Sequence, residues 1–187
     1  DIMTTADFYT VGLRTNSYLI ISDFIAQFED YTIPLIDHLV DIKTGHWDIS
    51  IREITAKTLN KLTARNVDYM KSIILNKLLQ KADSIDVNVR HGFILAVGEI
   101  VLAIKQLNQP ISEEVEAMLS SLMIKFQTRD QFRGMSGELM RMASLDFIKN
   151  CSDAHLQVTD ECIESWQTLI DSCITSKTTR IRQLAVN

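Results

Sequence analysis

The sequence predicts an all-α fold made of stacked helical hairpins, and two observations support this prediction. The chain has 187 residues, of which 46% are hydrophobic, and only 2 Pro and 6 Gly stand where helices could be interrupted. Arg14, Arg52 and Arg90 also recur at a fixed interval of 38 residues. A repeat of about 40 residues with two helical stretches per unit is typical of HEAT and armadillo arrays, so we predict a right-handed α-solenoid.

The repeat extends to the neighbours of each arginine. Aliphatic residues stand three positions before it and hydrophobic residues ten positions after it, namely Val11, Ile49 and Val87, and Phe24, Leu62 and Ile100. Asp48 and Asp86 precede Arg52 and Arg90 by four residues. Because an Asp and an Arg near the start of each second helix can bond neighbouring layers, we expect Arg14, Asp48, Arg52, Asp86 and Arg90 to form a structural ladder. Contact with a ligand is the alternative.

Helices are predicted through almost all of the first half of the chain. Hydrophobic residues recur at helical spacing over residues 6–28, which predicts one long helix. Pro34 suits the first turn of a second helix, since proline has no amide hydrogen to donate. Asp48 offers a carboxylate at the start of a third helix, a fourth covers about 68–82, and a fifth begins at Asp86.

The second half of the chain continues the helical pattern after a break at Asn108-Gln109-Pro110. Ser112 is a suitable N-cap for the next helix. Thr128 and Gln131 have the spacing of a capping box, which predicts a helix from Thr128 to about residue 150. Thr159 begins another helix, and Arg182 opens a last, short one.

We therefore expect one array of five units, with approximate bounds 1–28, 29–66, 67–108, 109–150 and 151–187. The interval from Arg90 to Arg133 is 43 residues and that from Arg133 to Arg182 is 49, which loop insertions on one face would explain. Residue 1 is Asp rather than Met, and the final residues read as a helix that stops in mid-pattern. These ends predict a fragment of a longer solenoid.

Composition argues against several classes of partner. The formal net charge of -5 disfavours bulk attraction to nucleic acid or to an anionic membrane. The 3 cysteines are odd in number and form no C-x-x-C, which favours reduced thiols in a cytoplasmic protein. We expect no membrane span, because no stretch approaches about 18 apolar residues, and the N-terminus does not have the pattern of a signal peptide.

Catalytic patterns are weak, so we predict no catalytic residue, no metal site and no cofactor. The 4 histidines form no H-E-x-x-H motif, and no Cys and His spacing matches a zinc site. Gly134 to Gly137 lacks the strand and the lysine of a phosphate-binding loop. Cys151 and His155 are four residues apart, so a thiol beside an imidazole is the enzymatic alternative, although an ordinary thiol is expected.

Binding patterns are more informative. Lys57, Lys61 and Arg65 are spaced by four residues, so they form one stripe on a helix. A solvated face and a contact with an acidic partner both remain open. His46 and Trp47 lie at a predicted turn between two helices, and such turns line one edge of a solenoid, where partners dock. We expect Trp47 to pack in the core or between helices, with an exposed anchor as the alternative.

Several strings of residues resemble the C-terminal region of the tubulin folding cofactor D family. They are Tyr31-Thr32-Ile33-Pro34-Leu35-Ile36-Asp37-His38-Leu39-Val40, His46-Trp47-Asp48, Ile51-Arg52-Glu53, Arg90-His91-Gly92, Ile94-Leu95-Ala96, Phe132-Arg133-Gly134 and Gly137-Glu138-Leu139-Met140-Arg141. The resemblance spans most of residues 7–170. It implies a segment of a large HEAT-repeat chaperone of the cytoplasm, with the cytoskeleton and the centrosome as further locations.

The resemblance also implies partners. The family captures β-tubulin and works with tubulin cofactors E and C and an Arf-like small GTPase to assemble or take apart the αβ-tubulin heterodimer. GTP hydrolysis by tubulin would then be promoted indirectly, by a chain that is not itself an enzyme. The candidate partner-binding residues are Lys57, Lys61, Arg65, His46, Trp47, His91 and Arg141. The alternative is a docking module that braces the solenoid, or holds a cofactor or the GTPase, without touching tubulin.

Overall fold

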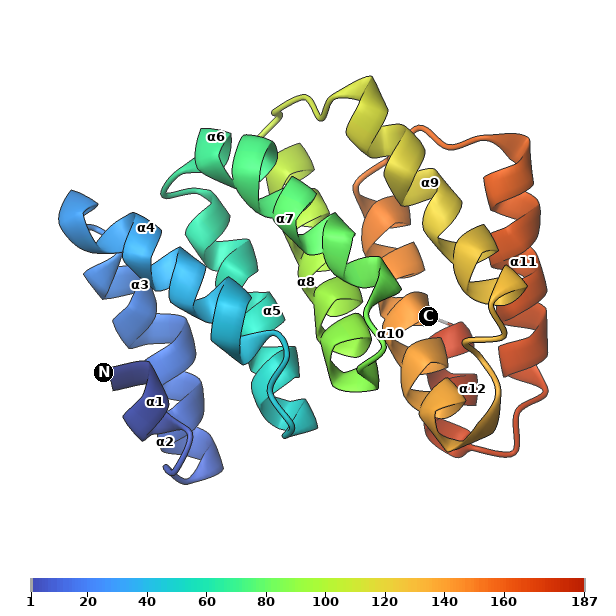
Figure 1. Cartoon of the computed structure of the whole chain (residues 1–187), viewed down its shortest axis with the longest axis horizontal. Helices are drawn as coiled ribbons and strands as arrows, with labels where there is room; N and C mark the ends of the chain where they lie inside the picture. Colours follow the sequence, from blue (N-terminus) through green and yellow to red (C-terminus); the bar gives the residue numbers. More distant parts are fainter. Residues whose placement is uncertain (1, 187) are drawn as a thin grey trace.

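The computed structural model describes residues 2–186, with the side chains of Ile2 and Met135 excepted. The described residues form helices and no strand, and successive helices pack side by side in a curved stack (Figure 1). This architecture confirms the predicted all-α helical-repeat array.

Helices pair in the order in which they occur along the chain. The first layer contains α1 (Ile2–Ala6) and a continuous segment of α2 (Val11–Asn16), η1 (Ser17–Ile21) and α3 (Ser22–Ile25). The second contains α4 (Glu29–His38), η2 (Leu39–Lys43) and α5 (Ile49–Thr63). The third contains α6 (Val67–Tyr69), η3 (Met70–Ile74), α7 (Leu75–Leu79), η4 (Gln80–Asp83) and α8 (Val87–Gln106). The fourth pairs α9 (Glu113–Thr128) with α10 (Gly134–Asp153), and the fifth pairs α11 (Asp160–Ile174) with α12 (Thr179–Ala185).

Four helices begin at the capping residues that the sequence predicted. The side chains of Asp48, Asp86, Ser112 and Thr159 each accept a hydrogen bond from a backbone amide in the first turn of α5, α8, α9 and α11, respectively. Such a cap satisfies one of the amides that a helix start leaves without an intrahelical acceptor, and it contributes about 1 kcal/mol.

Four predicted boundaries were wrong. The last helix, α12, begins at Thr179 rather than at Arg182. The helix expected over 6–28 is broken between Ala6 and Val11, because the Arg14 guanidinium bonds the carbonyls of Asp7 and Tyr9 and holds a turn there. Pro34 lies inside α4, which begins five residues earlier, rather than in its first turn. Thr128 ends α9 and does not start α10, although its spacing to Gln131 matches a capping box.

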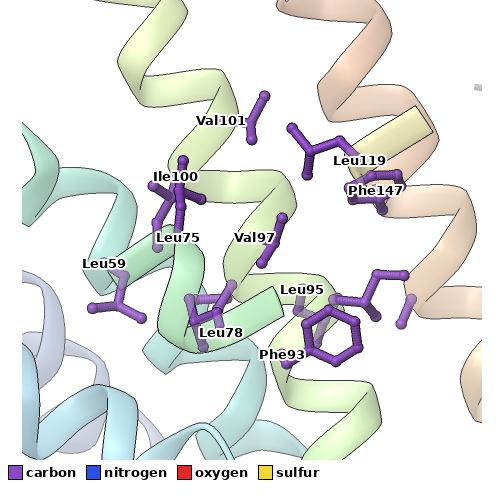
Figure 2. Packing of buried hydrophobic residues seen from close by; sticks show 14 of the residues in the cluster. Leu59, Leu75, Leu78, Phe93, Leu95, Val97, Ile100, Val101, Leu119 and Phe147 are labelled. Atoms are coloured by element: carbon purple, nitrogen blue, oxygen red, sulfur yellow. The ribbon is translucent and has the colours of Figure 1, made fainter. Parts of the chain in front are cut away.

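The core is centred on α8, which packs between α5 and α10 (Figure 1). Val97 and Ile100 of α8 are fully buried, with Leu59 of α5, Leu75 of α7 and Phe147 of α10 around them (Figure 2). By length and composition alone α8 could cross a membrane, contrary to our expectation that no stretch would approach this limit. Its place between two helices explains the composition, because a helix covered on all sides is apolar on all sides.

Candidate functional site

The turns within the helix pairs lie along one edge of the molecule, the lower edge in Figure 1, which we call the turn edge. An arginine in the following helix holds several of these turns in the same way. Arg52 Nη1 donates to the carbonyls of His46 at 2.6 Å and Trp47 at 3.0 Å. Arg90 Nη1 donates to the carbonyls six and five residues before it, and Arg182 Nη1 does the same at 2.7 and 2.9 Å. Each turn is thus fixed by the helix that follows it.

The fourth layer departs from this pattern. Gly137 stands where the other layers have arginine, and a Cβ there would lie 2.4 Å from the carbonyl oxygen of Phe132. The turn therefore packs directly on the helix, with no room for a long side chain. In the sequence, Arg133 was taken as the equivalent of Arg52 and Arg90 after a longer interval. It is instead exposed and pairs with Asp130 at 3.1 Å.

Two of these arginines, Arg14 and Arg52, also connect neighbouring layers. Arg14 Nη1 lies 3.4 Å from Asp48 Oδ2 and donates to Ser50 Oγ at 3.0 Å. Arg52 Nη1 donates to Asn88 Oδ1 at 3.0 Å, so Asn88 occupies the place in the third layer that Ser50 has in the second. Asp86, which the ladder prediction placed beside Arg52, accepts the capping bond from the Asn88 amide instead.

His91 is a buried structural residue, which argues against its expected contact with a partner. Arg52 Nε donates to His91 Nδ1 at 3.1 Å, a bond that only a neutral imidazole can accept at that atom. Burial lowers the pKa of His91 to about 3, and the nearby Arg52 and Arg180 guanidinium groups add to this effect. His91 therefore stays neutral and helps to hold α8 against α5.

Trp47, which was expected to pack in the core or between helices, is instead exposed on the turn edge. Its side chain is 78% exposed, and its ring lies beside that of His46, with centroids 5.4 Å apart. His46 faces inward: its Nδ1 accepts from the Asp48 amide at 3.0 Å, and burial lowers its pKa. Trp47 therefore presents an apolar surface to solvent, supported from behind by His46.

Tyr9 and Ile85 occupy the positions equivalent to Trp47, 38 residues before and after it. Both are exposed, Ile85 at 99% and Tyr9 at 37%. We call Tyr9, Trp47 and Ile85 the apolar row. The 38-residue interval of the arginines already aligns these three positions in the sequence, but the predicted site included Trp47 alone.

The basic stripe is largely used within the molecule. Lys61 Nζ donates to the carbonyl of Leu19 at 2.7 Å, and Arg65 donates to Asp23 Oδ1 through Nε at 3.0 Å and Nη2 at 2.9 Å. Lys61 connects α5 to the first layer, and Arg65 does the same from the turn that follows α5, so the stripe is not a continuous free basic surface. Lys57 is exposed and lines a separate hollow, and Arg141 is half-buried on α10.

That hollow has a volume of about 360 Å³ and lies between α5, α8, α10 and α12. Glu53, Glu99 and Asp146 line it, each from a different helix, and Arg180 Nη2 pairs with Glu53 Oε1 at 3.1 Å. Burial, and then the Glu53 and Glu99 charges, raise the pKa of Asp146 to about 6. This cluster could not be predicted from a local sequence pattern, because Arg180 and Glu53 are 127 residues apart.

The three thiols are not arranged for nucleophilic chemistry. Cys151, Cys162 and Cys173 are all buried, and burial raises the pKa of each of them. His155 is exposed on a turn in the left-handed region, while Cys151 is fully buried, so the structure does not join them as a reactive pair. Over residues 2–186, no group of three or more His, Cys, Asp or Glu side chains could hold a metal ion.

The stacked pairs and their exposed turn edge define a helical-repeat protein suited to binding other proteins through an extended surface. The chain is 32% identical over 151 residues, or 79% of its length, to tubulin-specific chaperone D of Dictyostelium discoideum. This similarity confirms the resemblance to the tubulin folding cofactor D family. The matched region spans 10% of the length of that relative. Comparison with protein-family models and with solved structures finds no match.

Proposed function

We propose that the chain is a segment of a tubulin-folding chaperone, corresponding to the C-terminal region of chaperone D. In this role it helps to bind β-tubulin in the cytoplasm. With tubulin cofactors E and C and an Arf-like small GTPase, it assembles or takes apart the αβ-tubulin heterodimer. The similarity to tubulin-specific chaperone D over 79% of the chain is the observation that supports this function.

The surface chemistry supports protein binding rather than catalysis. The three thiols are buried, and His91 is neutral and bonded to Arg52 within the core, so neither the thiols nor His91 is placed as an activated nucleophile or general base. A curved stack of helices offers a long surface to a folded client. Any effect on GTP hydrolysis would therefore be indirect, through the position in which the segment holds tubulin.

Crosslinking within the full assembly tests this function. Lys57 and Lys177 are exposed on different layers, and Lys149 lies on the edge of the hollow. Amine-reactive crosslinks from these lysines to β-tubulin, in a complex that also contains the cofactors and the GTPase, are the expected result. Crosslinks from all three that reach only cofactor E, cofactor C or the GTPase would contradict tubulin binding by this segment.

The docking module remains the second candidate, and one observation favours it. Lys61 and Arg65, which the tubulin-binding hypothesis placed at the interface, bond Leu19 and Asp23 of the first layer. Their positive charge braces the solenoid, so an acidic client gains little from the stripe. A docking role predicts that β-tubulin capture by the longer protein is unchanged when Lys57 is replaced by glutamate.

A further inference from the structure

We infer that the contact between the first and second layers, which we call the first interface, is a hinge. The first layer turns away there as a folded unit, while the second to fifth layers stay packed. Such a motion goes beyond the proposed function, because it does not depend on which partner binds. Three features define the hinge: the small side chains that the first layer buries, the polar bonds that hold it, and the short connection about which it turns.

The side chains that the first layer buries are mostly small. Over residues 3–28 they are Met3, Ala6, Ser17, Tyr18, Ser22 and Ala26. The helix α8 at the centre of the core instead buries large side chains such as Phe93 and Ile100 (Figure 2). Because hydrophobic stabilisation scales with the apolar area removed from water, packing holds the first layer less strongly than it holds the layers around α8.

The second layer also leaves large apolar side chains of the first layer uncovered. Leu13 and Phe24 are each 58% exposed. Ile51 and Leu62 occupy the equivalent positions 38 residues later, and they are 1% and 0% exposed. The apolar contacts that fix the second layer in the array are therefore not repeated at these positions of the first.

One buried ion pair crosses the first interface. Lys43 Nζ donates to Asp7 Oδ2, and the two side chains are 2% and 11% exposed. The attraction within a buried pair is offset by the cost of removing both ions from water, and both regain water when the layers separate. The pair therefore specifies how the layers align without adding much to the stability of the closed arrangement.

Partly exposed ion pairs hold the rest of the first interface. Arg14 Nη1 lies 3.4 Å from Asp48 Oδ2, and Arg65 Nη2 lies 2.9 Å from Asp23 Oδ1. Ion pairs that water reaches contribute little to stability, and salt screens them. Added salt should therefore favour the open arrangement of the first layer.

The connection between the two layers supplies the pivot. Residues 26–28 link α3 to α4, and Thr32 Oγ1 holds this end by donating to the carbonyls of Ala26 at 3.0 Å and Phe28 at 3.2 Å. The turn between α1 and α2, which contains Asp7, lies at the other end of the layer, on the turn edge (Figure 1). Hinges are a few residues at the ends of elements that absorb the change in backbone angles. The layers should therefore part at the turn edge.

The test measures three distances between spin labels at exposed positions. The pair Thr10 and Ile85 spans the first interface along the turn edge, Thr10 and Gln27 lie within the first layer, and Ile85 and Lys177 span the third to fifth layers. The native thiols are buried and should not be labelled. We expect a longer population of the first distance to grow at least about threefold when salt rises from about 0.05 M to 1 M. The other two distances should not change.

A variant tests the buried ion pair. Lys43→Met leaves Asp7 in the first interface without the ammonium group that pairs with it, so it should raise the longer population at low salt at least about tenfold. Lys125→Met is the matched control, because it breaks the 2.8 Å pair with Asp83 between the third and fourth layers. It should leave the distance across the first interface unchanged.

Three outcomes would overturn the hinge. The first is a distance across the first interface that neither salt nor Lys43→Met changes. The second is an equal change within the first layer, which would mean that this layer unfolds rather than turning as a unit. The third is an equal lengthening across the third to fifth layers, which would mean that the whole array stretches.

Discussion

At the scale of single residues, the recurring arginine fixes the turns of successive layers. Arg52 is almost fully buried and bonds two carbonyls of its own turn, Asn88 of the next layer and His91. An ammonium group cannot reach this planar set of acceptors at once. Arg52→Lys should therefore lower the free energy of unfolding by about 2–4 kcal/mol, measured by urea denaturation. Arg133→Lys, at an exposed arginine, should change it by less than about 0.5 kcal/mol, and equal effects would contradict the assigned role.

Asp146 gives a second prediction at the same scale. Its pKa is raised to about 6 by burial and by the Glu53 and Glu99 charges. A raised pKa means that the folded state favours the protonated acid, so this contribution to stability is complete below about pH 4 and is lost as the pH rises through 6. Asp146→Asn should therefore raise the free energy of unfolding by about 1–2 kcal/mol at pH 7.5 and have little effect at pH 4. Urea denaturation at both pH values, with the exposed Asp153→Asn as control, measures the difference, and a destabilised Asn variant at pH 7.5 would oppose it.

At the scale of elements, the sequence predicted what depends on near neighbours in the chain. Asp48, Asp86, Ser112 and Thr159 could be recognised as caps, because a cap bonds an amide two or three residues away. The turn between α1 and α2 was missed because it depends on a guanidinium that follows it in the next helix. The capping-box pattern at Thr128 led to a wrong helix start. The pattern is local, and it does not distinguish a helix that begins at Thr128 from one that ends there.

The packing of elements also leads to a prediction at Gly92. A Cβ at this position of α8 would lie 1.6 Å from the carbonyl oxygen of Thr44, which follows η2 in the second layer. The two layers can approach this closely only because the side chain is absent. Gly92→Ala should force the layers apart and lower the free energy of unfolding by about 3 kcal/mol or more. Gly12→Ala is the matched control, because no atom lies within 4 Å of its added Cβ, and thermal denaturation should show a small stabilisation.

At the scale of the whole molecule, the polar side-chain contacts between layers mainly join adjacent layers, as expected of a solenoid, but within residues 2–186 the pair between Arg180 and Glu53 joins layers that are not adjacent. Arg180 at the start of α12 pairs with Glu53 of α5, and Glu99 and Asp146 line the same hollow. An ion pair between side chains as exposed as these contributes about 0–1 kcal/mol. Its larger effect should therefore be on shape rather than on stability, because it joins the second layer to the fifth.

This shape effect can be measured as a distance between spin labels at the exposed residues Ala64 of the second layer and Gln183 of the fifth; the native thiols are buried and should not be labelled. Arg180→Glu would bring a fourth carboxylate to the hollow, so repulsion should move α12 outward and lengthen the distance. Combining Arg180→Glu with Glu53→Arg restores an opposite pair and should return the distance to its original value. A distance that Arg180→Glu leaves unchanged, or that the exchanged pair fails to restore, would mean that packing against α10 and α11 alone sets the position of α12. The curvature of the array would then be independent of the charged hollow.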